Sequence, residues 1–90
     1  MRWNLEFSKK AVKQLEKLDK SASKIIVSWL MKNIDGCDNP RKFGKPLSGE
    51  LSNQWRYAIG DYRALCQIQD NKLIVLALSV GHRKSIYRKK

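Results

Sequence analysis

The spacing of hydrophobic residues changes along this chain and divides it into a helical half and an extended half. Asn4-Leu5-Glu6-Phe7 alternates polar and apolar residues, which predicts a short first strand. Hydrophobic residues then recur every three or four positions through residues 11–18 and again through residues 25–34, which predicts two helices. Because the link between them is short, we expect an antiparallel helical hairpin.

The ends of the two expected helices carry residues that favour helix termini. Ser8 suits an N-cap of the first helix, and Asp19 or Ser21 could begin the second. Gly36 follows the second periodic set, at a place where a left-handed backbone conformation commonly ends a helix.

The second half of the chain has a period of two and is separated from the helices by a loop. Proline and glycine interrupt residues 38–50, and from Trp55 onward extended runs cover about 53–59, 62–69 and 72–80. Gly60-Asp61 and Asp70-Asn71 are turn dipeptides between these runs. The third run is apolar on both faces, which suggests a strand covered on both sides.

These elements predict a single α+β domain over residues 1–90. The expected order is β-α-α-β-β-β, an antiparallel sheet with the helical hairpin packed on one face. A turn or short helix should follow Val80.

Side-chain alternation places arginines on one face of this sheet. If Gly60-Asp61 forms a two-residue loop, Ala58 pairs with Arg63 and Arg56 with Leu65. Arg56 and Arg63 are then diagonal neighbours at roughly 7–8 Å, an arrangement that favours a bound anion because like charges repel. Alternatively, both side chains reach solvent or pair with Asp61, Glu50 or another carboxylate. Trp55 and the residues in phase with it point toward the helices.

The same argument extends to the last strand. A two-residue loop at Asp70-Asn71 puts Leu78 opposite Arg63, and Val80 and His82 then share the face of the two arginines. His82 is the only histidine and the natural proton-transfer group at neutral pH, although a lone histidine is more often structural than catalytic. A three-residue loop at either turn would break this result.

The charge of the chain points to a polyanionic partner. Nineteen Lys and Arg against eight Asp and Glu give a net charge of +11, and Lys and Arg contacts to phosphate dominate nucleic-acid binding. A solvated basic surface, or one bound by an acidic protein, explains the same charge.

Other chemistries lack their motifs. Cys66 has the phase of a core residue and Cys37 lies in a loop, and neither has the spacing of a metal site or a disulfide framework. Trp3, Trp29 and Trp55 have the phase of core residues rather than of platforms for nucleic-acid bases. No metal or cofactor is expected, and no apolar run approaches the roughly 20 residues of a membrane span. We expect a cytoplasmic protein.

The chain resembles the RelE family of bacterial type II toxins. The fragments that carry the resemblance occur in family order over nearly the whole chain: Phe7-Ser8-Lys9-Lys10-Ala11, Gly44-Lys45-Pro46-Leu47-Ser48-Gly49, Trp55-Arg56-Tyr57, Gly60-Asp61-Tyr62-Arg63, Val80-Gly81-His82-Arg83 and Ile86-Tyr87-Arg88. The resemblance implies a ribosome-dependent endoribonuclease that cleaves mRNA in the ribosomal A site without a metal. The 2′-OH would attack the adjacent phosphorus.

The resemblance also implies roles for individual residues. Arg63, His82, Arg83 and Tyr87 are the candidate catalytic residues. The arginines hold the phosphate, His82 is a candidate for proton transfer, and Tyr87 matches a tyrosine that transfers a proton or holds the substrate base. The candidate RNA-binding residues are Lys45, Arg56, Lys84 and Arg88. Some relatives carry a lysine where this chain has Ala58, and others carry a glutamate base where it has Lys45. We therefore expect His82 to substitute for the base.

The implied partners are mRNA, the ribosome and an acidic RelB-like antitoxin, through which the toxin–antitoxin complex would bind operator DNA. Two alternatives remain: a gyrase-poisoning toxin of the ParE group that lacks nuclease activity, and a non-enzymatic basic module that binds nucleic acid.

Overall fold

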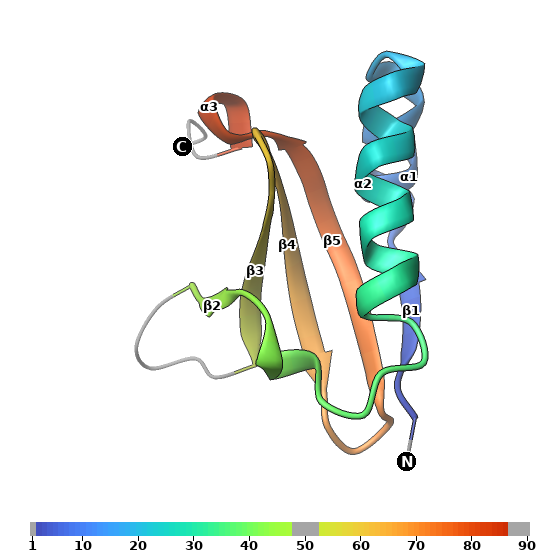
Figure 1. The fold of residues 1–90 in the computed structure, drawn as a ribbon, viewed down its shortest axis with the longest axis vertical. Helices are drawn as coiled ribbons and strands as arrows, with labels where there is room; N and C mark the ends of the chain where they lie inside the picture. The colour runs from blue at the N-terminus through green and yellow to red at the C-terminus, as the bar shows by residue number, and fades with distance from the viewer. Residues whose placement is uncertain (1, 48–52, 87–90) are drawn as a thin grey trace.

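In the computed structural model, which describes residues 2–47 and 53–86, helices pack against one face of a mixed five-stranded sheet (Figure 1). The strands lie in the order β1-β5-β4-β3-β2. The elements are β1 (Asn4–Phe7), α1 (Lys9–Lys17), α2 (Lys20–Asn33), the 3₁₀ turn η1 (Pro40–Lys42), β2 (Lys45–Pro46), β3 (Gln54–Ile59), β4 (Tyr62–Gln69), β5 (Ile74–His82) and α3 (Arg83–Ile86).

The predicted order of elements and the α+β class are confirmed, with two differences in the sheet. β1 pairs in parallel with β5, whereas every other pair is antiparallel, so the sheet is mixed and not wholly antiparallel. The parallel pair arises because the helical hairpin carries the chain back along the sheet before β2 begins. A short strand, β2, also forms inside the predicted loop and pairs with β3.

The two helices begin at the caps that the sequence predicts. The Ser8 side chain accepts a hydrogen bond from the Ala11 N–H, and Asp19 caps α2 by accepting from the Ala22 N–H. Gly36 has a φ of +81°, the left-handed conformation expected after α2. The hairpin is therefore encoded locally by its own termini.

The core lies between the hairpin and one face of the sheet. Ile26, Leu30 and Ile34 of the α2 region are fully buried, and Tyr57 of β3 and Val75 of β5 meet them from the sheet. Trp55, Ile59, Ala64 and Cys66 are also buried, as the alternation of β3 and β4 predicts. Ile25, which belongs to the predicted apolar set, lies instead on the exposed side of α2.

The prediction that the last strand is covered on both sides is wrong. Val75, Ala77 and Val80 of β5 are buried, but Leu78 is 37% exposed and Leu76 is only partly buried. The helices cover a single face, because α1 passes beside the free edge of β5 rather than over its second face. There the Gln14 side chain accepts hydrogen bonds from the Val80 N–H at 2.7 Å and the Ser79 hydroxyl at 3.2 Å.

A β-bulge in β5 changes which side chains share a face. Leu65 pairs with Ser79 and Cys66 pairs with Ala77, so Leu78 is an extra residue without a partner in β4. The β4–β5 turn spans residues 70–73, two more than predicted. Two additional turn residues leave the alternation of faces unchanged, whereas one bulged residue reverses it.

A candidate nucleic-acid groove

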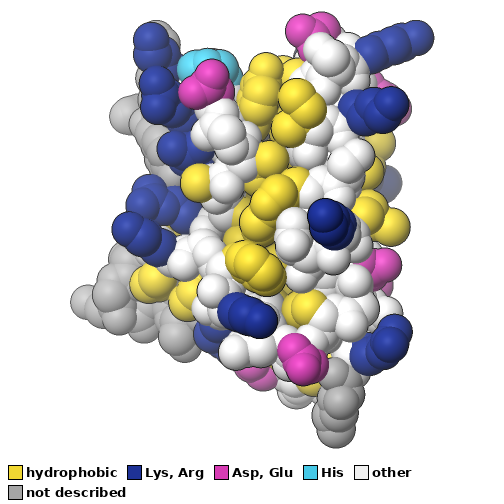
Figure 2. Space-filling view, in the orientation of Figure 1, with side chains coloured by type: hydrophobic (Ala, Val, Ile, Leu, Met, Phe, Trp, Pro, Cys, Tyr) yellow, Lys and Arg dark blue, Asp and Glu magenta, His cyan; other side chains and the backbone are white. Residues whose placement is uncertain are grey.

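A groove of about 720 Å³ lies at the β2 edge of β3, and its lining includes arginines of the sheet as well as Trp29 of α2. Its described lining contains five basic residues and none that is acidic. The lining consists of Trp29, Phe43, Gly44, Lys45, Arg56, Ala58, Arg63, Arg83 and Lys84. In Figure 2, Lys and Arg side chains gather along the margin of the molecule formed by α3, β3 and β2. This margin is the most plainly basic surface in that view.

One wall of the groove is a cross-strand pair of cations. Lys45 of β2 pairs directly with Arg56 of β3, so their side chains rise from the same face. Gly44 brings the chain close enough to β3 for this pairing. It has a φ of +76°, and an added Cβ would lie 2.8 Å from the Trp55 Nε1 and would collide with the Arg56 carbonyl oxygen.

Arg63 and Arg83 both line the groove and both contact the β3–β4 turn. The Arg63 Nη1 donates to the carbonyl oxygens of Gly60 at 2.9 Å and Tyr62 at 2.8 Å. The Arg83 N–H donates to the Asp61 carbonyl oxygen at 2.8 Å, and its Nε lies 4.0 Å from the Asp61 carboxylate. The same tight turn therefore contacts two arginines that are 20 residues apart in the chain, Arg63 through its guanidinium and Arg83 mainly through its backbone.

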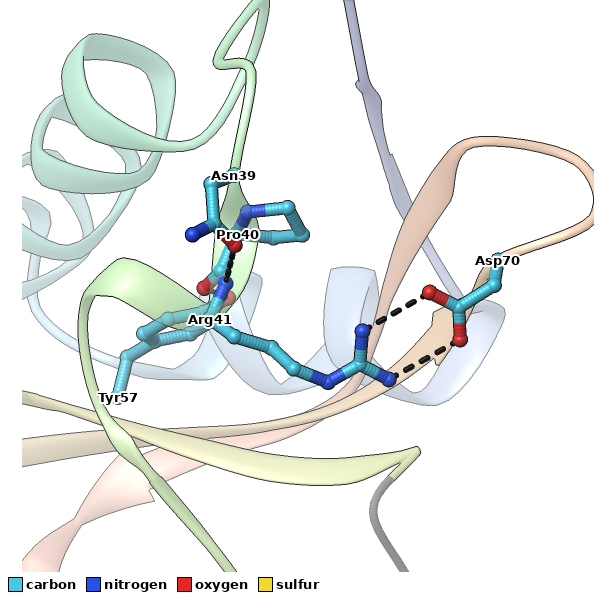
Figure 3. Close-up of polar contacts among 5 residues, drawn as sticks. All are labelled: Asn39, Pro40, Arg41, Tyr57 and Asp70. Atoms are coloured by element: carbon cyan, nitrogen blue, oxygen red, sulfur yellow. Dashed lines mark hydrogen bonds and ion pairs between the residues drawn. The ribbon is translucent and has the colours of Figure 1, made fainter.

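Residues 39–46, which we term the strap, lead from α2 to the groove and are fastened to the sheet at several points (Figure 3). The Arg41 guanidinium forms two hydrogen bonds with the Asp70 carboxylate, at 2.8 and 3.0 Å, and its Cζ lies 5.7 Å from the centroid of the Trp55 ring. The Tyr57 hydroxyl donates to the Pro40 carbonyl oxygen at 2.7 Å. These contacts fix the backbone that delivers Gly44 and Lys45.

The ion pair between Arg41 of the strap and Asp70 shifts the pKa values of both groups. The hydrogen bonds from Arg41 lower the pKa of the Asp70 carboxyl, and Asp70 in turn raises the pKa of Arg41. Burial raises the pKa of the Tyr57 hydroxyl well above its ordinary value, so this group stays a neutral donor to Pro40.

His82 does not lie where the sequence argument put it. Arg63 pairs with Gly81 rather than Leu78, whereas His82 pairs with Tyr62 and Val80 with the buried Ala64. His82 and Val80 therefore occupy strand positions that face the helix-covered side of the sheet. The prediction that they share the face of Arg63 is wrong. The cause is the bulge at Leu78, which shifts the alternation of faces by one residue.

The contacts of His82 are local. Its ring meets the Tyr62 ring edge-to-face with centroids 5.8 Å apart, and its Nδ1 accepts a hydrogen bond from the Lys84 N–H at 3.1 Å. His82 thus contacts the first turn of α3, which carries Arg83 and Lys84 into the groove.

The other predicted site residues divide into two groups. The groove brings together Lys45, Arg56, Arg63, Arg83 and Lys84. Tyr87 and Arg88 lie outside the described residues. Among residues 2–47 and 53–86, no group of three or more His, Cys, Asp and Glu side chains could hold a metal ion, and no helix is long and apolar enough to cross a membrane.

Trp29 and Phe43 are groove residues that sequence reasoning missed. Trp29 was expected in the core because its spacing matches the buried side of α2, and Phe43 lies in a loop without regular spacing. Only the path of the strap back toward α2 brings the two rings to the groove. The one sequence signal was the aromatic residue between the basic residues Lys42 and Lys45.

Comparison with known proteins gives this groove a family context. The family described as ParE toxin of the type II toxin–antitoxin system parDE matches residues 5–87, which is most of the chain. The chain therefore belongs to the RelE/ParE superfamily of type II toxins. The resemblance inferred from the sequence motifs is confirmed.

Individual members of this superfamily are similar over almost their full length. The chain is 32% identical to Toxin RelG of Mycobacterium tuberculosis, covering 99% of this chain and 100% of that protein. It superposes on a chain of the RelBE2 toxin–antitoxin complex of the same organism with a TM-score of 0.79 and 29% identity, covering 92% and 93% of the two chains.

A further solved structure supports the fold of this toxin. A doubly substituted form of E. coli toxin RelE in the free state has a TM-score of 0.76 and 24% identity, with coverage of 94% and 87%. The family match carries the ParE name, whereas these relatives carry the names RelG, RelBE2 and RelE. Membership in the superfamily therefore does not by itself identify the molecular target of this toxin.

Proposed function

We propose that this toxin is a metal-independent endoribonuclease that cleaves mRNA in the ribosomal A site. The observation that carries the proposal is the convergence of Arg56, Arg63 and Arg83, with Lys45 and Lys84, on one groove whose described lining has no carboxylate. The positive charge gathered in this groove attracts a phosphate chain, although Arg83 also lies 4.0 Å from the Asp61 carboxylate.

The chemistry requires charge stabilisation more than any other contribution. When a ribose 2′-oxygen attacks the adjacent phosphorus, negative charge accumulates on the non-bridging oxygens, and the 5′-oxygen departs with a proton. Guanidinium groups held in place beforehand stabilise that charge most strongly. The Arg63 guanidinium meets this requirement, because its Nη1 donates to two backbone carbonyl oxygens at the β3–β4 turn. For Arg83 the same turn fixes the backbone, through the hydrogen bond from its N–H to the Asp61 carbonyl oxygen.

Lys45, Arg56 and Lys84 would bind the flanking phosphates in this mechanism, together with Arg88. Proton transfer is assigned to His82 and Tyr87. His82 occupies a strand position on the face opposite to that of Arg63. Its imidazole would therefore have to act from the end of the sheet, beside α3. The 2′-OH is the nucleophile, so RNA and not DNA is the substrate.

The partners follow from the same surface and from the relatives. A superposable M. tuberculosis chain was solved in a toxin–antitoxin complex. We propose an acidic RelB-like antitoxin for this chain, since a net charge of +11 attracts an anionic protein. The toxin would bind operator DNA only through that antitoxin, and it would act on ribosomes in the cytoplasm.

The deciding experiment maps cuts in one mRNA, by primer extension, with and without translation. Wild-type protein should produce new cuts only in translated mRNA. Arg63→Ala should reduce them by about 10²–10³-fold, the usual cost of removing one group that stabilises transition-state charge. Arg2→Ala, which removes an exposed arginine outside the groove, is the matched control.

The ParE name of the matching family makes gyrase poisoning the second candidate. That activity would leave mRNA whole and stall replication in the same cells. Undiminished cuts with Arg63→Ala would remove Arg63 from the mechanism, whereas intact mRNA with wild-type protein would contradict the nuclease proposal itself.

A further inference from the structure

The basic groove has an aromatic margin that the charge argument does not use. Trp29 of α2 and Phe43 of the strap line the same groove as Arg56 and Arg63, and both rings are only partly buried. Neither residue was a candidate from the sequence. Their placement beside five cations joins an apolar aromatic surface to a phosphate-binding one.

The two rings are held rigidly. Trp29 lies 5.6 Å from Phe43 between ring centroids, at an interplanar angle of 79°, and 5.5 Å from Tyr57 at 45°. Tyr57 is fully buried and supports the Trp29 ring from the core. The Phe43 carbonyl oxygen accepts a hydrogen bond from the Trp55 Nε1–H at 2.6 Å, which fixes the backbone of the second ring.

This rigidity has a consequence for binding. A ligand that contacts these rings does not have to immobilise them, so less conformational entropy is lost on association. A tryptophan needed only to pack α2 against the sheet could be fully covered, as Leu30 on the same helix is. Trp29 instead remains accessible from the groove.

A ligand that fits both surfaces has phosphates and flat apolar rings within a few ångströms of each other. Single-stranded RNA has this chemistry, because every nucleotide joins a phosphate to an unpaired base that stacks on aromatic side chains. An acidic peptide would satisfy the cations but has no planar group at each charged unit. The lining therefore favours a nucleotide strand over a peptide.

We propose that Trp29 and Phe43 form a base-binding subsite, which stacks an unpaired base of the mRNA strand whose phosphates occupy the basic groove. The inference rests on the proposed function for its RNA ligand. It assigns two residues from separate elements to holding a base beside the phosphate on which Arg63 and Arg83 act.

The test removes the base and leaves the phosphate. Ribosomes are programmed with short mRNAs that carry one abasic ribonucleotide, placed in turn at each position near the cut. Wild-type toxin should lose about 5- to 150-fold in kcat/KM at one position, the range expected for one stacking contact. Phe43→Leu, which keeps an apolar side chain without an aromatic face, should cut the unmodified mRNA more slowly and show little further loss at that position.

Two further variants separate stacking from folding. Trp29→Phe should retain most of the sensitivity to the abasic position, whereas Trp29→Leu should lose it, and thermal unfolding of each variant reports its stability. Arg63→Ala should slow cleavage of every mRNA but keep the wild-type dependence on the abasic position.

The outcomes distinguish the two proposals. If wild-type toxin cuts the mRNA and Phe43→Leu has the same abasic dependence as wild type, the subsite is refuted and the nuclease stands. If wild-type toxin leaves programmed mRNA intact, the proposed function fails first.

Discussion

Arg63 lies directly across the β4–β5 ladder from Gly81, because Leu78 is an extra residue in β5. The residue opposite the arginine therefore has no side chain. An added Cβ on Gly81 would lie 3.7 Å from the Ile86 Cδ1, so α3 covers Gly81 and brings Arg83 toward the groove. The bulge at Leu78 thus determines both which residue pairs with Arg63 and on which face of the sheet His82 lies.

The first prediction concerns the fork shape of Arg63. Its Nη1 is held by two backbone carbonyl oxygens, so the guanidinium has a fixed orientation that an ammonium group cannot reproduce. Arg63→Lys should keep KM on programmed ribosomes within a few fold of wild type but lower kcat by about 10-fold or more. Single-turnover cleavage rates measure this split, and a wild-type kcat would show that positive charge alone is sufficient.

The second prediction concerns His82. His82→Ala should slow cleavage by about 10²-fold, the lower end of the usual effect of a proton-transfer group, and leave ribosome binding nearly intact. His82→Asn is the informative companion, because an amide oxygen can accept the Lys84 N–H in place of Nδ1 but cannot transfer a proton. An Asn variant that cuts at the wild-type rate would make His82 a positioning residue for α3.

The third prediction concerns the clamp on the strap. Arg41 and Asp70 are partly exposed, so their coupling in a double-mutant cycle should be small, about 0.5–1 kcal/mol at neutral pH. Because folding lowers the pKa of Asp70, this contribution is present above the ordinary carboxyl pKa of about 4 and is lost as the pH falls through the lower folded value. Urea unfolding of both single variants and the double variant, near pH 7 and near pH 2, measures the coupling. An equal coupling at both pH values would contradict the ionic interpretation.

The fourth prediction compares two glycines with positive φ. Gly44→Ala should lower the free energy of unfolding by about 2 kcal/mol or more, because its Cβ would collide with β3 in addition to straining the backbone. Gly60→Ala is the control: its φ is +60° but nothing lies within 4 Å of the added Cβ, so about 1 kcal/mol is expected. Equal losses of unfolding free energy for the two variants in denaturant titrations would show that the close approach of the strap to β3 does not contribute to stability.

The fifth prediction concerns alkaline pH. Burial raises the pKa of the Cys66 thiol to about 12 and also raises that of the Tyr57 hydroxyl, so the folded protein holds protons that the unfolded chain releases. The free energy of unfolding should therefore fall as the pH rises above about 9, by up to ~1.4 kcal/mol per pH unit for each group. Cys66→Ala should make this slope shallower, as thermal unfolding at several pH values can show. An unchanged slope would assign the effect to other groups.

The sequence predicted much of the site because several of its determinants are local. Ser8 and Asp19 cap their helices through backbone N–H groups three residues away, and Gly60-Asp61 closes a two-residue hairpin whose register fixes Arg56 and Arg63. Contacts at such short range depend on few neighbours, and a sequence pattern can therefore state them. The face on which His82 lies depended instead on the bulge at Leu78, which no sequence pattern indicates.

The sequence by itself determined the helical hairpin, the face shared by Arg56 and Arg63, and the excess of positive charge. Only the tertiary structure decided how Arg83 reaches the groove from α3, that the His82 position faces the helix-covered side of the sheet, and that Trp29 meets Phe43 at the groove. The physical reason is that alternation is a property of one strand, whereas a bulge, a parallel pairing and a strap across the sheet arise from packing between distant segments.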